Sequence, residues 1–397
     1  MCKWQVSALL RLTSRIGSFR RFGCSAVRGT KTALAVLAML TSVLAWGSAP
    51  VRADDKPGHL GPHEVRVLTQ NMYVGASLGI LLQNQGDFAT AIAKFTHDLL
   101  ATKAAERAAA MAAEIAEQRP DFVALHEVWK LVDAKGNVVE DLLQYVLDAL
   151  KALGQPYKLA HDEVHDAIAV VDAEELVDPC GITGQIKDRG AILMRTDGDI
   201  QIMNVQPLKF FPPISIPLRC NPPPAIPTII STTPGFVFVD ATVRGIPLRF
   251  VSVHLVPNPT TIEAHTLDLL DKTASPTLPL VFGGDFNTTA NDPSNISYKL
   301  VYQHLIDAGL TDAWNPHIHR PGLGLTCCQK PLLNEPSDLT TRVDLILFSG
   351  AFEVEDINLI GNKETDRTPS GLWPSDHAGL VATLATPLCQ IEGRCGR

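Results

Sequence analysis

The sequence predicts an α/β protein in which sheets and helices are stacked in layers. Short apolar segments of strand length alternate with longer segments of helical period along most of the chain, and this alternation is typical of layered α/β folds. Hydrophobic residues make up 46% and charged residues 19% of the 397 residues, which excludes a disordered chain and a collagen. No repeat with a period of about 20–50 residues is visible, which argues against a solenoid or a propeller.

The expected elements follow one another along the chain. Residues 64–70 (EVRVLTQ) form the first strand. The Ala-rich residues 87–118 form one or two helices, which end before Pro120 because proline cannot continue a helix. Residues 121–125 (DFVAL) form a short buried strand, and residues 138–153 have helical period. Further strands are expected at 190–195, 235–243, 248–255, 278–282, 343–348 and 379–384, and further helices at 261–272 and 296–308.

Residues 206–234 interrupt this pattern. The segment has nine prolines in 29 residues and contains the pair Phe210-Phe211. Because proline has no N–H for a ladder hydrogen bond, such a segment cannot be a central strand. We expect a long surface insertion, which acts either as a rigid spacer or, through residues 210–216, as a lip that makes transient contact with substrate or a membrane.

The basic residues are concentrated at the start of the chain. The whole sequence has 34 Lys and Arg against 42 Asp and Glu, a formal net charge of −8. Residues 1–53 contain eight of the basic residues and no acidic residue, so removing them leaves 26 basic against 42 acidic residues, a net charge of −16. A body this acidic is a poor candidate for a stable nucleic-acid coat, because phosphate neutralisation needs clustered Lys and Arg. It does not exclude a nuclease whose metal ions supply the positive charge.

Residues 1–53 have the layout of an export signal. A basic region precedes an uncharged apolar run of 14 residues, 33–46, and small residues lead to Ala53. We expect cleavage near Ala53 and a secreted or periplasmic protein. An uncleaved membrane anchor is the alternative, although the run is too short to span a bilayer comfortably. The expected organisation is a leader (1–53), a linker (54–63), one domain (64–386) and a C-terminal tail (387–397).

Six cysteines remain after the leader, an even number that indicates disulfides in an exported protein. The sequence alone leaves the pairing open. A structural zinc site is the alternative, but no C-x-x-C spacing supports it. The economical pairing is Cys180 with Cys220 and Cys389 with Cys395, which leaves Cys327 and Cys328 as a vicinal pair.

Polar residues able to bind a metal or a phosphate lie at the ends of the expected strands. A single Asp at a strand end is usually a turn residue, but here the pattern recurs on separate segments. Loops converge at strand ends of α/β sheets, and ligands bind there. These residues are Asn71, Glu127, His254, Asp285, Asn287, Asp344, Asp376 and His377.

The chemistry of these residues suits metal-assisted attack of water on a phosphoester. Glu127 and one or two further oxygen donors make a site for a hard cation such as Mg²⁺. Asp285 and Asn287 are two residues apart and project to the same side of an extended chain, so that one can activate water while the other donates to a phosphoryl oxygen. His254 and His377 suit phosphate binding or proton transfer near neutral pH.

Six segments that contain these residues together resemble the endonuclease/exonuclease/phosphatase superfamily, which includes DNase I, abasic-site endonucleases and bacterial sphingomyelinases. They occur in family order and are TQNMYVG, DFVALHEVW, VSVHL, VFGGDFNTT, TRVDLILF and WPSDHAGLVATL. GDFN with a downstream RVD and a terminal SDH is a strong combination, although each segment alone is weak. The likeness is closest to exported bacterial members of unsettled substrate. It implies a DNase I-like, four-layer αββα sandwich with the site at one end of two packed sheets.

The resemblance also implies a metal site. Glu127 and Asn71 would hold Mg²⁺, with Asp376 close to the metal, and Mn²⁺ and Ca²⁺ are alternative cations. One departure from the family pattern is His126, which precedes Glu127 where the family often has Gln. We expect His126 to be a buried, hydrogen-bonded side chain rather than a ligand.

The remaining site residues acquire catalytic roles from the same resemblance. Asp285 and Asn287 would position or activate water. His254 and His377 would contact the scissile phosphate, with Asp344 paired to His377. Whether Asp285 or His377 is the general base differs between members, and the sequence leaves this open.

The sequence therefore predicts a secreted, Mg²⁺-dependent phosphodiesterase that acts on a nucleic acid, a phospholipid headgroup or a small phosphoester. Nucleases usually show a basic groove, and the chain after residue 53 has no run of Lys and Arg. A sphingomyelinase-like enzyme needs exposed apolar contacts, which residues 210–216 would provide. These observations leave the substrate undecided, and the oligomeric state is not predicted. The alternative is a catalytically inactive binding module on the same fold, which predicts the loss of site residues, whereas all the main ones are present.

Overall fold

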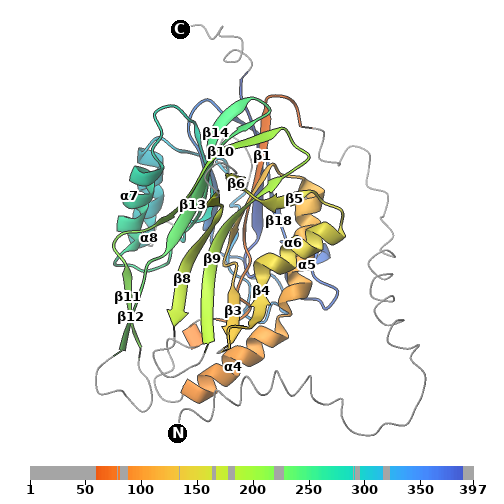
Figure 1. Cartoon of the computed structure of the whole chain (residues 1–397), viewed down its shortest axis with the longest axis vertical. Helices are drawn as coiled ribbons and strands as arrows, with labels where there is room; N and C mark the ends of the chain where they lie inside the picture. Colours follow the sequence, from red (N-terminus) through yellow and green to blue (C-terminus); the bar gives the residue numbers. More distant parts are fainter. Residues whose placement is uncertain are drawn as a thin grey trace, which may run out of the picture. The chain divides into compact units, whose positions relative to one another are not determined.

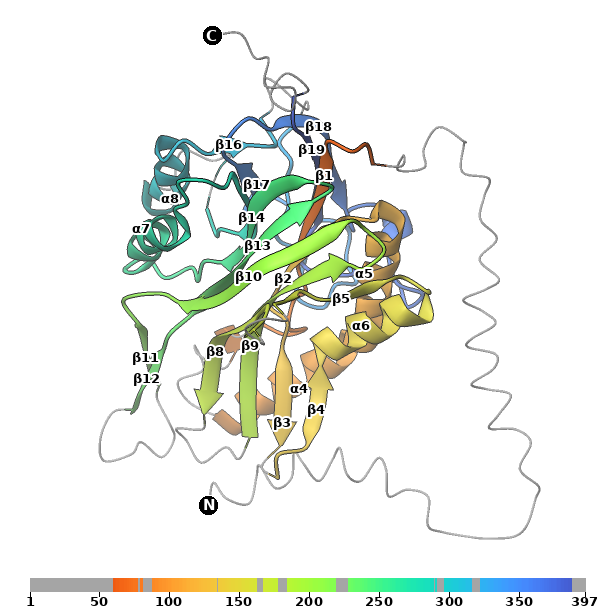
Figure 2. The ribbon, with the colours of Figure 1, turned by 45° about the horizontal axis from the view of Figure 1, so that its top comes forward.

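Two β-sheets lie face to face, and helices cover the outer face of each sheet (Figures 1 and 2). The computed structural model describes residues 60–77, 79–80, 88–133, 135–162, 167–177, 184–218, 228–288, 290, 296–315 and 322–387. They belong to a unit that begins at Leu60. The order of layers confirms the expected four-layer αββα sandwich.

The first sheet has nine strands, and its central strands carry one half of the candidate site. Strand β1 (Glu64–Asn71) lies between β19 (Gly379–Ala385), which is antiparallel to it, and β2 (Phe122–His126), which is parallel to it. Strand β9 (Gly184–Arg195) pairs with the other side of β2. The remaining strands are β18 (Glu353–Ile360) beyond β19, and β3 (Lys130–Asp133), β4 (Val138–Asp141), β5 (Tyr157–Leu159) and β8 (Val170–Val177) on the side of β9.

The second sheet has six strands and carries the other half of the site. Strand β14 (Ile246–His254) runs parallel to β15 (Leu280–Asp285), which pairs with the antiparallel β17 (Asp344–Phe348). The outer strands are β10 (Ile200–Lys209) and β13 (Gly235–Val243) on one side and β16 (Thr311–Asp312) on the other. Two small hairpins join β6 (His161–Asp162) to β7 (Ala167–Ile168) and β11 (Ile214–Leu218) to β12 (Thr228–Thr232).

Five α-helices in the described part of the chain form the outer layers. Those on the first sheet pack through residues such as Met111 and Ile115. Those on the second sheet pack through residues such as Leu269 and Val301. The first group is α4 (Phe88–Ala101), α5 (Ala104–Gln118) and α6 (Leu142–Ala152), and the second is α7 (Ile262–Thr273) and α8 (Ile296–Asp307); a 3-10 turn, η1 (Glu364–Asp366), follows β18.

The core between the sheets fixes the strands relative to one another. Phe122 of β2 stacks on Phe250 of β14 with 5.3 Å between ring centroids. In β1, Val67 faces the opposite sheet and Leu68 faces the helices, so this strand is buried on both faces. Each large aliphatic side chain buried in this way contributes about 1.5–3 kcal/mol. The core therefore holds rigid the strand ends at which the candidate residues lie.

The expected strands and helices are present with shifts of a few residues, apart from one segment. Residues 138–141, expected to start a helix, form strand β4 instead. The helix begins only after Asp141, whose side chain accepts a hydrogen bond from the N–H of Gln144 and caps α6. Two consecutive valines before this cap favour the extended conformation.

The expected insertion at 206–234 is wrong at its start. Residues up to Lys209 complete β10, an edge strand in which Pro207 is tolerated because one side of an edge needs no ladder partner. Phe210 is buried and packs against Phe236, with 4.9 Å between ring centroids. Phe211 is 70% exposed, so the expected lip offers one exposed aromatic side chain at its base.

The expected leader and nearly all of the C-terminal tail lie outside the described residues. The cysteines of the two economical pairings, Cys180, Cys220, Cys389 and Cys395, also lie outside them. Within the described residues, no helix combines the length and the apolar character needed to cross a membrane.

Candidate active site

The sheet register brings the predicted residues to one end of the sandwich. In the second sheet, His254 at the end of β14 lies opposite Asp285 at the end of β15, and Asp285 lies opposite Asp344 at the start of β17. In the first sheet, Asn71 ends β1, and Glu127 directly follows β2. Parallel neighbours end at the same edge, so strand topology alone places these side chains together.

Asp285 lies at the centre of the site and is buried. Its Oδ2 accepts a hydrogen bond from Nδ2 of Asn71 at 3.1 Å and lies 3.6 Å from Nε2 of His254 and 3.9 Å from Nδ1 of His377. Its Oδ1 accepts from the N–H of Asn287 at 2.9 Å. Burial by itself raises the pKa of Asp285, but the two imidazoles outweigh burial and lower it below its ordinary value.

His377 is oriented by Asp344. Its Nδ1 lies 2.7 Å from Oδ2 of Asp344, and both side chains are buried. Burial disfavours the charged imidazole, but the carboxylates of Asp344 and Asp376 outweigh this and raise the pKa of His377 well above its ordinary value. Burial also raises the pKa of Asp344, with the charge of His377 opposing the rise. Because Nδ1 is engaged by Asp344, Nε2 is the ring nitrogen left to face a ligand.

His254 is held from two sides. Nδ2 of Asn287 lies 3.2 Å from its Nε2, and the same amide donates to the carbonyl of Leu255 at 2.8 Å. Oδ2 of Asp188, on β9, lies 4.0 Å from its Nδ1. Burial alone lowers the pKa of His254, but nearby carboxylates, that of Asp285 first, raise it above the ordinary value. Two imidazoles that favour the charged form therefore flank one carboxylate.

Asn71 and Glu127 are in contact, but through the amide nitrogen of Asn71. Its Nδ2 donates to Oε1 of Glu127 at 3.0 Å, while its Oδ1 accepts from the N–H of Tyr73 at 2.9 Å. Oε2 of Glu127 accepts from the N–H of Val74 at 3.3 Å. Glu127 itself has a left-handed backbone, with φ of 52°, which turns the chain at the end of β2. In this arrangement Asn71 orders the carboxylate of Glu127 rather than presenting its own oxygen to a cation.

The donor set fits a hard divalent cation. Burial and the charge of Glu127 raise the pKa of Asp376 to about 7, against the opposing charge of His377. Two carboxylates that repel each other in this way are stabilised by a bound cation, and carboxylate oxygens are the ligands that Mg²⁺ prefers. Glu127 and Asp376 would hold the cation, which would polarise a phosphoryl oxygen. A different trio, Asp285, Asp344 and His377, has ligand-type atoms within 4.8 Å of one another.

His126 is buried and its Nε2 lies 3.0 Å from Oγ1 of Thr69, which confirms the expected structural role. Burial, together with the charge of the neighbouring His254, lowers its pKa to about 3. His126 is therefore neutral at physiological pH.

Sequence analysis missed Arg107 of α5, which is buried near the carboxylates of Glu127 and Asp376, the metal side of the site. Its Nη1 donates to the carbonyls of Met72 at 2.7 Å and Pro374 at 3.1 Å, and its Nη2 donates to the carbonyl of Tyr73 at 3.0 Å. It thus joins the loops that carry Asn71 and Asp376. A signal was present, because Arg107 lies four residues before Met111 on the apolar side of the helix, where a charge is out of place.

Ser375 and Asp188 were missed as well. Oγ of Ser375 donates to the carbonyl of Asn71 at 2.7 Å and accepts from the N–H of His377 at 3.2 Å, so it ties the end of β1 to the loop before the neighbouring strand β19. Its position directly before the Asp376-His377 pair was a signal for this role. Asp188 lies between Lys187 and Arg189, where a solvated charge is the ordinary expectation.

The family model described as the endonuclease/exonuclease/phosphatase family matches residues 68–377. No curated protein sequence matches the chain. Among solved structures, an endonuclease/exonuclease/phosphatase family protein from Leptotrichia buccalis has 19% sequence identity and a TM-score of 0.51, covering 81% of this chain and 99% of its own. A family member from Bacteroides thetaiotaomicron has 16% identity and a TM-score of 0.51, covering 84% of this chain and 98% of its own. At this identity the two structures establish a shared fold.

Proposed function

The chain belongs to the endonuclease/exonuclease/phosphatase family, whose members are nucleases or phosphatases, and we propose that it is an exported phosphodiesterase dependent on a divalent cation, Mg²⁺ first. The observation that carries this proposal is the central arrangement of the site. The carboxylate of Asp285 lies between His254 and His377, at 3.6 and 3.9 Å. Such an arrangement combines a proton acceptor for water with two donors for phosphoryl oxygens.

The residues divide the reaction between them. Asp285 takes the proton of the attacking water, since its pKa lies below the ordinary value and it is ionised at neutral pH. Nε2 of His377 donates to a phosphoryl oxygen, because its Nδ1 is engaged by Asp344. His254, whose charged form is favoured by the nearby carboxylates, donates to a second oxygen. The sequence left either Asp285 or His377 as the general base, and the geometry supports Asp285.

The metal side has a supporting role in this proposal. Glu127 and Asp376 would hold a cation, which would neutralise the charge of the substrate phosphate in a site that otherwise contains several carboxylates. Asn71 fixes Glu127 through the 3.0 Å hydrogen bond and also fixes Asp285 at 3.1 Å. It therefore couples the metal side to the general base.

The alternative function, an inactive binding module, is supported less well. Such a module needs the fold but not the catalytic arrangement, so other side chains can replace its site residues. Here the buried pair Asp344 and His377 and the central Asp285 keep hydrogen-bond geometry that catalysis uses and that simple binding does not require. We therefore favour the enzyme.

The substrate is a phosphodiester in a nucleic acid or a phospholipid headgroup. The exported chain of net charge −16 binds a polyanion only with help from cations, which favours a strongly metal-dependent reaction in either case. The exposed Phe211 offers an apolar contact next to the β11–β12 hairpin, which supports a transient membrane contact. If the lipid is the substrate, replacing Phe211 by Ser would weaken cleavage of sphingomyelin vesicles but not of the soluble diester bis-p-nitrophenyl phosphate.

The test is a substrate panel with purified protein. Plasmid DNA, RNA, sphingomyelin vesicles and bis-p-nitrophenyl phosphate are incubated with Mg²⁺, with Mn²⁺, and with EDTA. EDTA-sensitive cleavage of one substrate, lost in Asp285→Ala, supports the proposal and identifies the branch. Absence of turnover on every substrate with both metals supports the binding module instead.

A further inference from the structure

A short extended segment that contains Cys327 is fixed on both sides by backbone hydrogen bonds. On one side, Cys327 and Thr341 each donate an N–H to the carbonyl of the other at 2.9 Å. On the other side, the N–H of Gln329 donates to the carbonyl of Asp376 at 2.7 Å. Cys327 and His377 also occupy facing positions of a β-bridge. The segment is therefore held against the residues of the candidate active site.

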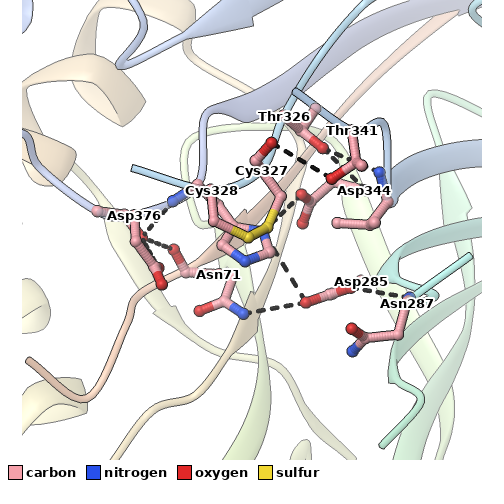
Figure 3. The surroundings of a disulfide bond; sticks show 12 residues. Asn71, Asp285, Asn287, Thr326, Cys327, Cys328, Thr341, Asp344 and Asp376 are labelled. Atoms are coloured by element: carbon pink, nitrogen blue, oxygen red, sulfur yellow. Dashed lines mark hydrogen bonds and ion pairs between the residues drawn. A yellow bond between two sulfur atoms is a disulfide. The ribbon is translucent and has the colours of Figure 1, made fainter. Parts of the chain in front are cut away.

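This segment carries a sulfur pair beside the catalytic imidazole. The structure joins Cys327 and Cys328 in a disulfide, and Figure 3 shows it between Asp376 on one side and Asp344 on the other. The two Sγ atoms and a ring nitrogen of His377 lie within 4.8 Å of one another. Cys327 is buried, whereas Cys328 is exposed, so a reductant in solution can reach one of the two sulfurs.

The ring of His377 is already arranged as a metal ligand. Its Nδ1 lies 2.7 Å from the carboxylate of Asp344, which leaves Nε2 for coordination. A carboxylate behind the imidazole is the usual outer partner of a metal-binding histidine, because it fixes the ring and raises its basicity. The donor set of two sulfurs and one imidazole is soft, unlike the oxygen donors of Glu127 and Asp376.

We propose that Cys327, Cys328 and His377 form a second metal site, which becomes available when the disulfide is reduced and which binds a thiophilic cation such as Zn²⁺. Zn–S bonds of about 2.3 Å and Zn–N bonds of about 2.0–2.1 Å place tetrahedral ligands roughly 3.5–3.8 Å apart, so the two sulfurs, which are bonded to each other in the disulfide, have to move apart on reduction to bind one cation beside His377. Three protein ligands leave the fourth position of the cation to water.

The redox step is an ordinary thiol–disulfide exchange with a small dithiol. One thiolate of the dithiol attacks the exposed sulfur of Cys328, and Cys327 leaves as a thiolate that takes a proton. The second thiol of the reductant then displaces Cys328, which gives two cysteine thiols and one cyclic disulfide of the reductant. Binding of Zn²⁺ displaces the two thiol protons and the proton on Nε2 of His377, and forms two Zn–S bonds and one Zn–N bond.

Occupation of this site stops hydrolysis, and this consequence rests on the proposed function. Nε2 of His377 is the atom that we assign to the phosphoryl oxygen, and a nitrogen bound to Zn²⁺ has no proton to donate. The protein thus has two forms that respond differently to the cation. The oxidised form is an active phosphodiesterase, and the reduced form is inhibited by thiophilic cations.

The test compares metal binding by the reduced protein and by Cys328→Ser. The full chain is reduced with a dithiol, freed from it by gel filtration without oxygen, and titrated with Zn²⁺ by calorimetry and with Co²⁺ by absorption. Reduced wild type should bind one more equivalent of cation than reduced Cys328→Ser and show a stronger thiolate-to-Co²⁺ charge-transfer band. The other cysteines are the same in both proteins, so their binding cancels in the difference. Cys327→Ser serves as the second variant, should either one fold poorly.

The outcomes separate the new site from the proposed function. Equal stoichiometry and equal Co²⁺ spectra in wild type and both variants overturn the site. An extra equivalent in the reduced wild type supports it, and Zn²⁺ should then lower hydrolysis by at least ~100-fold in the reduced but not in the oxidised protein, as expected for a lost proton-transfer group. An extra equivalent with unchanged hydrolysis supports the metal site and instead overturns the role of His377 in the proposed reaction.

Discussion

The carboxylate of Asp344 lies 2.7 Å from Nδ1 of His377, although the two residues are 33 positions apart in the sequence. Asp344 opens strand β17 of the second sheet, and His377 lies just before strand β19 of the first. The pair therefore joins the two sheets at the edge where the site lies. Its burial makes the interaction strong, because water does not screen it.

We predict that Asp344→Asn lowers kcat by at least ~100-fold, the scale for a disturbed general acid or base. The amide keeps the shape of the side chain but loses the charge that stabilises the protonated imidazole. Initial rates on the substrate identified by the panel measure the effect. Asp148→Asn, an exposed change on α6, is the matched control. An Asp344→Asn protein as active as this control would remove the pair from the mechanism.

Arg107→Met should destabilise the protein by roughly 3 kcal/mol or more, because four carbonyls lose a buried charged donor and each unsatisfied group costs about 1–3 kcal/mol. Urea unfolding at constant pH measures the loss. Arg107→Lys keeps the charge but lacks the planar set of N–H donors of the guanidinium, so its stability should fall between those of wild type and Arg107→Met. Stability equal to wild type in Arg107→Met would show that the guanidinium does not hold the two loops together.

Glu114 of α5 predicts a specific pH dependence of stability. Burial raises the pKa of its carboxyl well above the ordinary value, and the charge of Asp366 adds to the shift. The carboxyl therefore has a higher pKa in the folded than in the unfolded protein. Its contribution to the free energy of unfolding is complete below the unfolded-state pKa and is lost as pH rises toward the folded-state pKa. Glu114→Gln never ionises, so its stability relative to wild type should rise with pH, by at most about 1.4 kcal/mol per pH unit.

Urea unfolding midpoints at about pH 5 and about pH 8 measure this dependence. Asp148→Asn, an exposed change on α6 whose charge does not act on Glu114, is the control and should show a much smaller trend. A difference between Glu114→Gln and wild type that is constant across this range would mean that the carboxyl of Glu114 ionises as it does in water.

Metal binding should be visible without any substrate. Mg²⁺ at a hundredfold excess over its Kd should stabilise the protein by about 2.7 kcal/mol, seen as a higher Tm. Glu127→Gln and Asp376→Asn should each lose most of this shift, since each removes one carboxylate from the donor set. EDTA should return wild type to the Tm of the metal-free protein. If both variants keep the full shift, the cation binds elsewhere, and the trio of Asp285, Asp344 and His377 is the next set to test.

The main strands and the candidate site were predictable because both depend on local sequence. Buried strands such as β13 and β17 are short apolar runs, and the polar residues that end them are visible as breaks in those runs. The order of layers needed the family resemblance, since periodicity does not say which sheet a strand joins. Asn71 illustrates the limit: its position was predicted, but the direction of its amide depends on the N–H of Tyr73 in the folded loop.

The features that escaped prediction depend on contacts between distant segments. Strand β18 has a mixed polar sequence and is recognised as a strand only by its pairing with β19. Pro207 argued against a strand, but the edge position of β10 removes the penalty. In the sequence, Arg107 is an ordinary charged residue of an alanine-rich helix. Its role is visible only in the fold, where the loops of Met72 and Pro374 pack against it.

The most direct test of the account is single-turnover hydrolysis by wild type and Asp285→Asn, each with Mg²⁺ and with EDTA, on the substrate that the panel identifies. The asparagine keeps the shape of the side chain but cannot accept a proton from water. We predict EDTA-sensitive hydrolysis by wild type and a rate at least ~100-fold lower in Asp285→Asn with Mg²⁺ present. Equal rates in the two proteins, or a wild-type rate that EDTA leaves unchanged, would contradict the metal-dependent mechanism centred on Asp285.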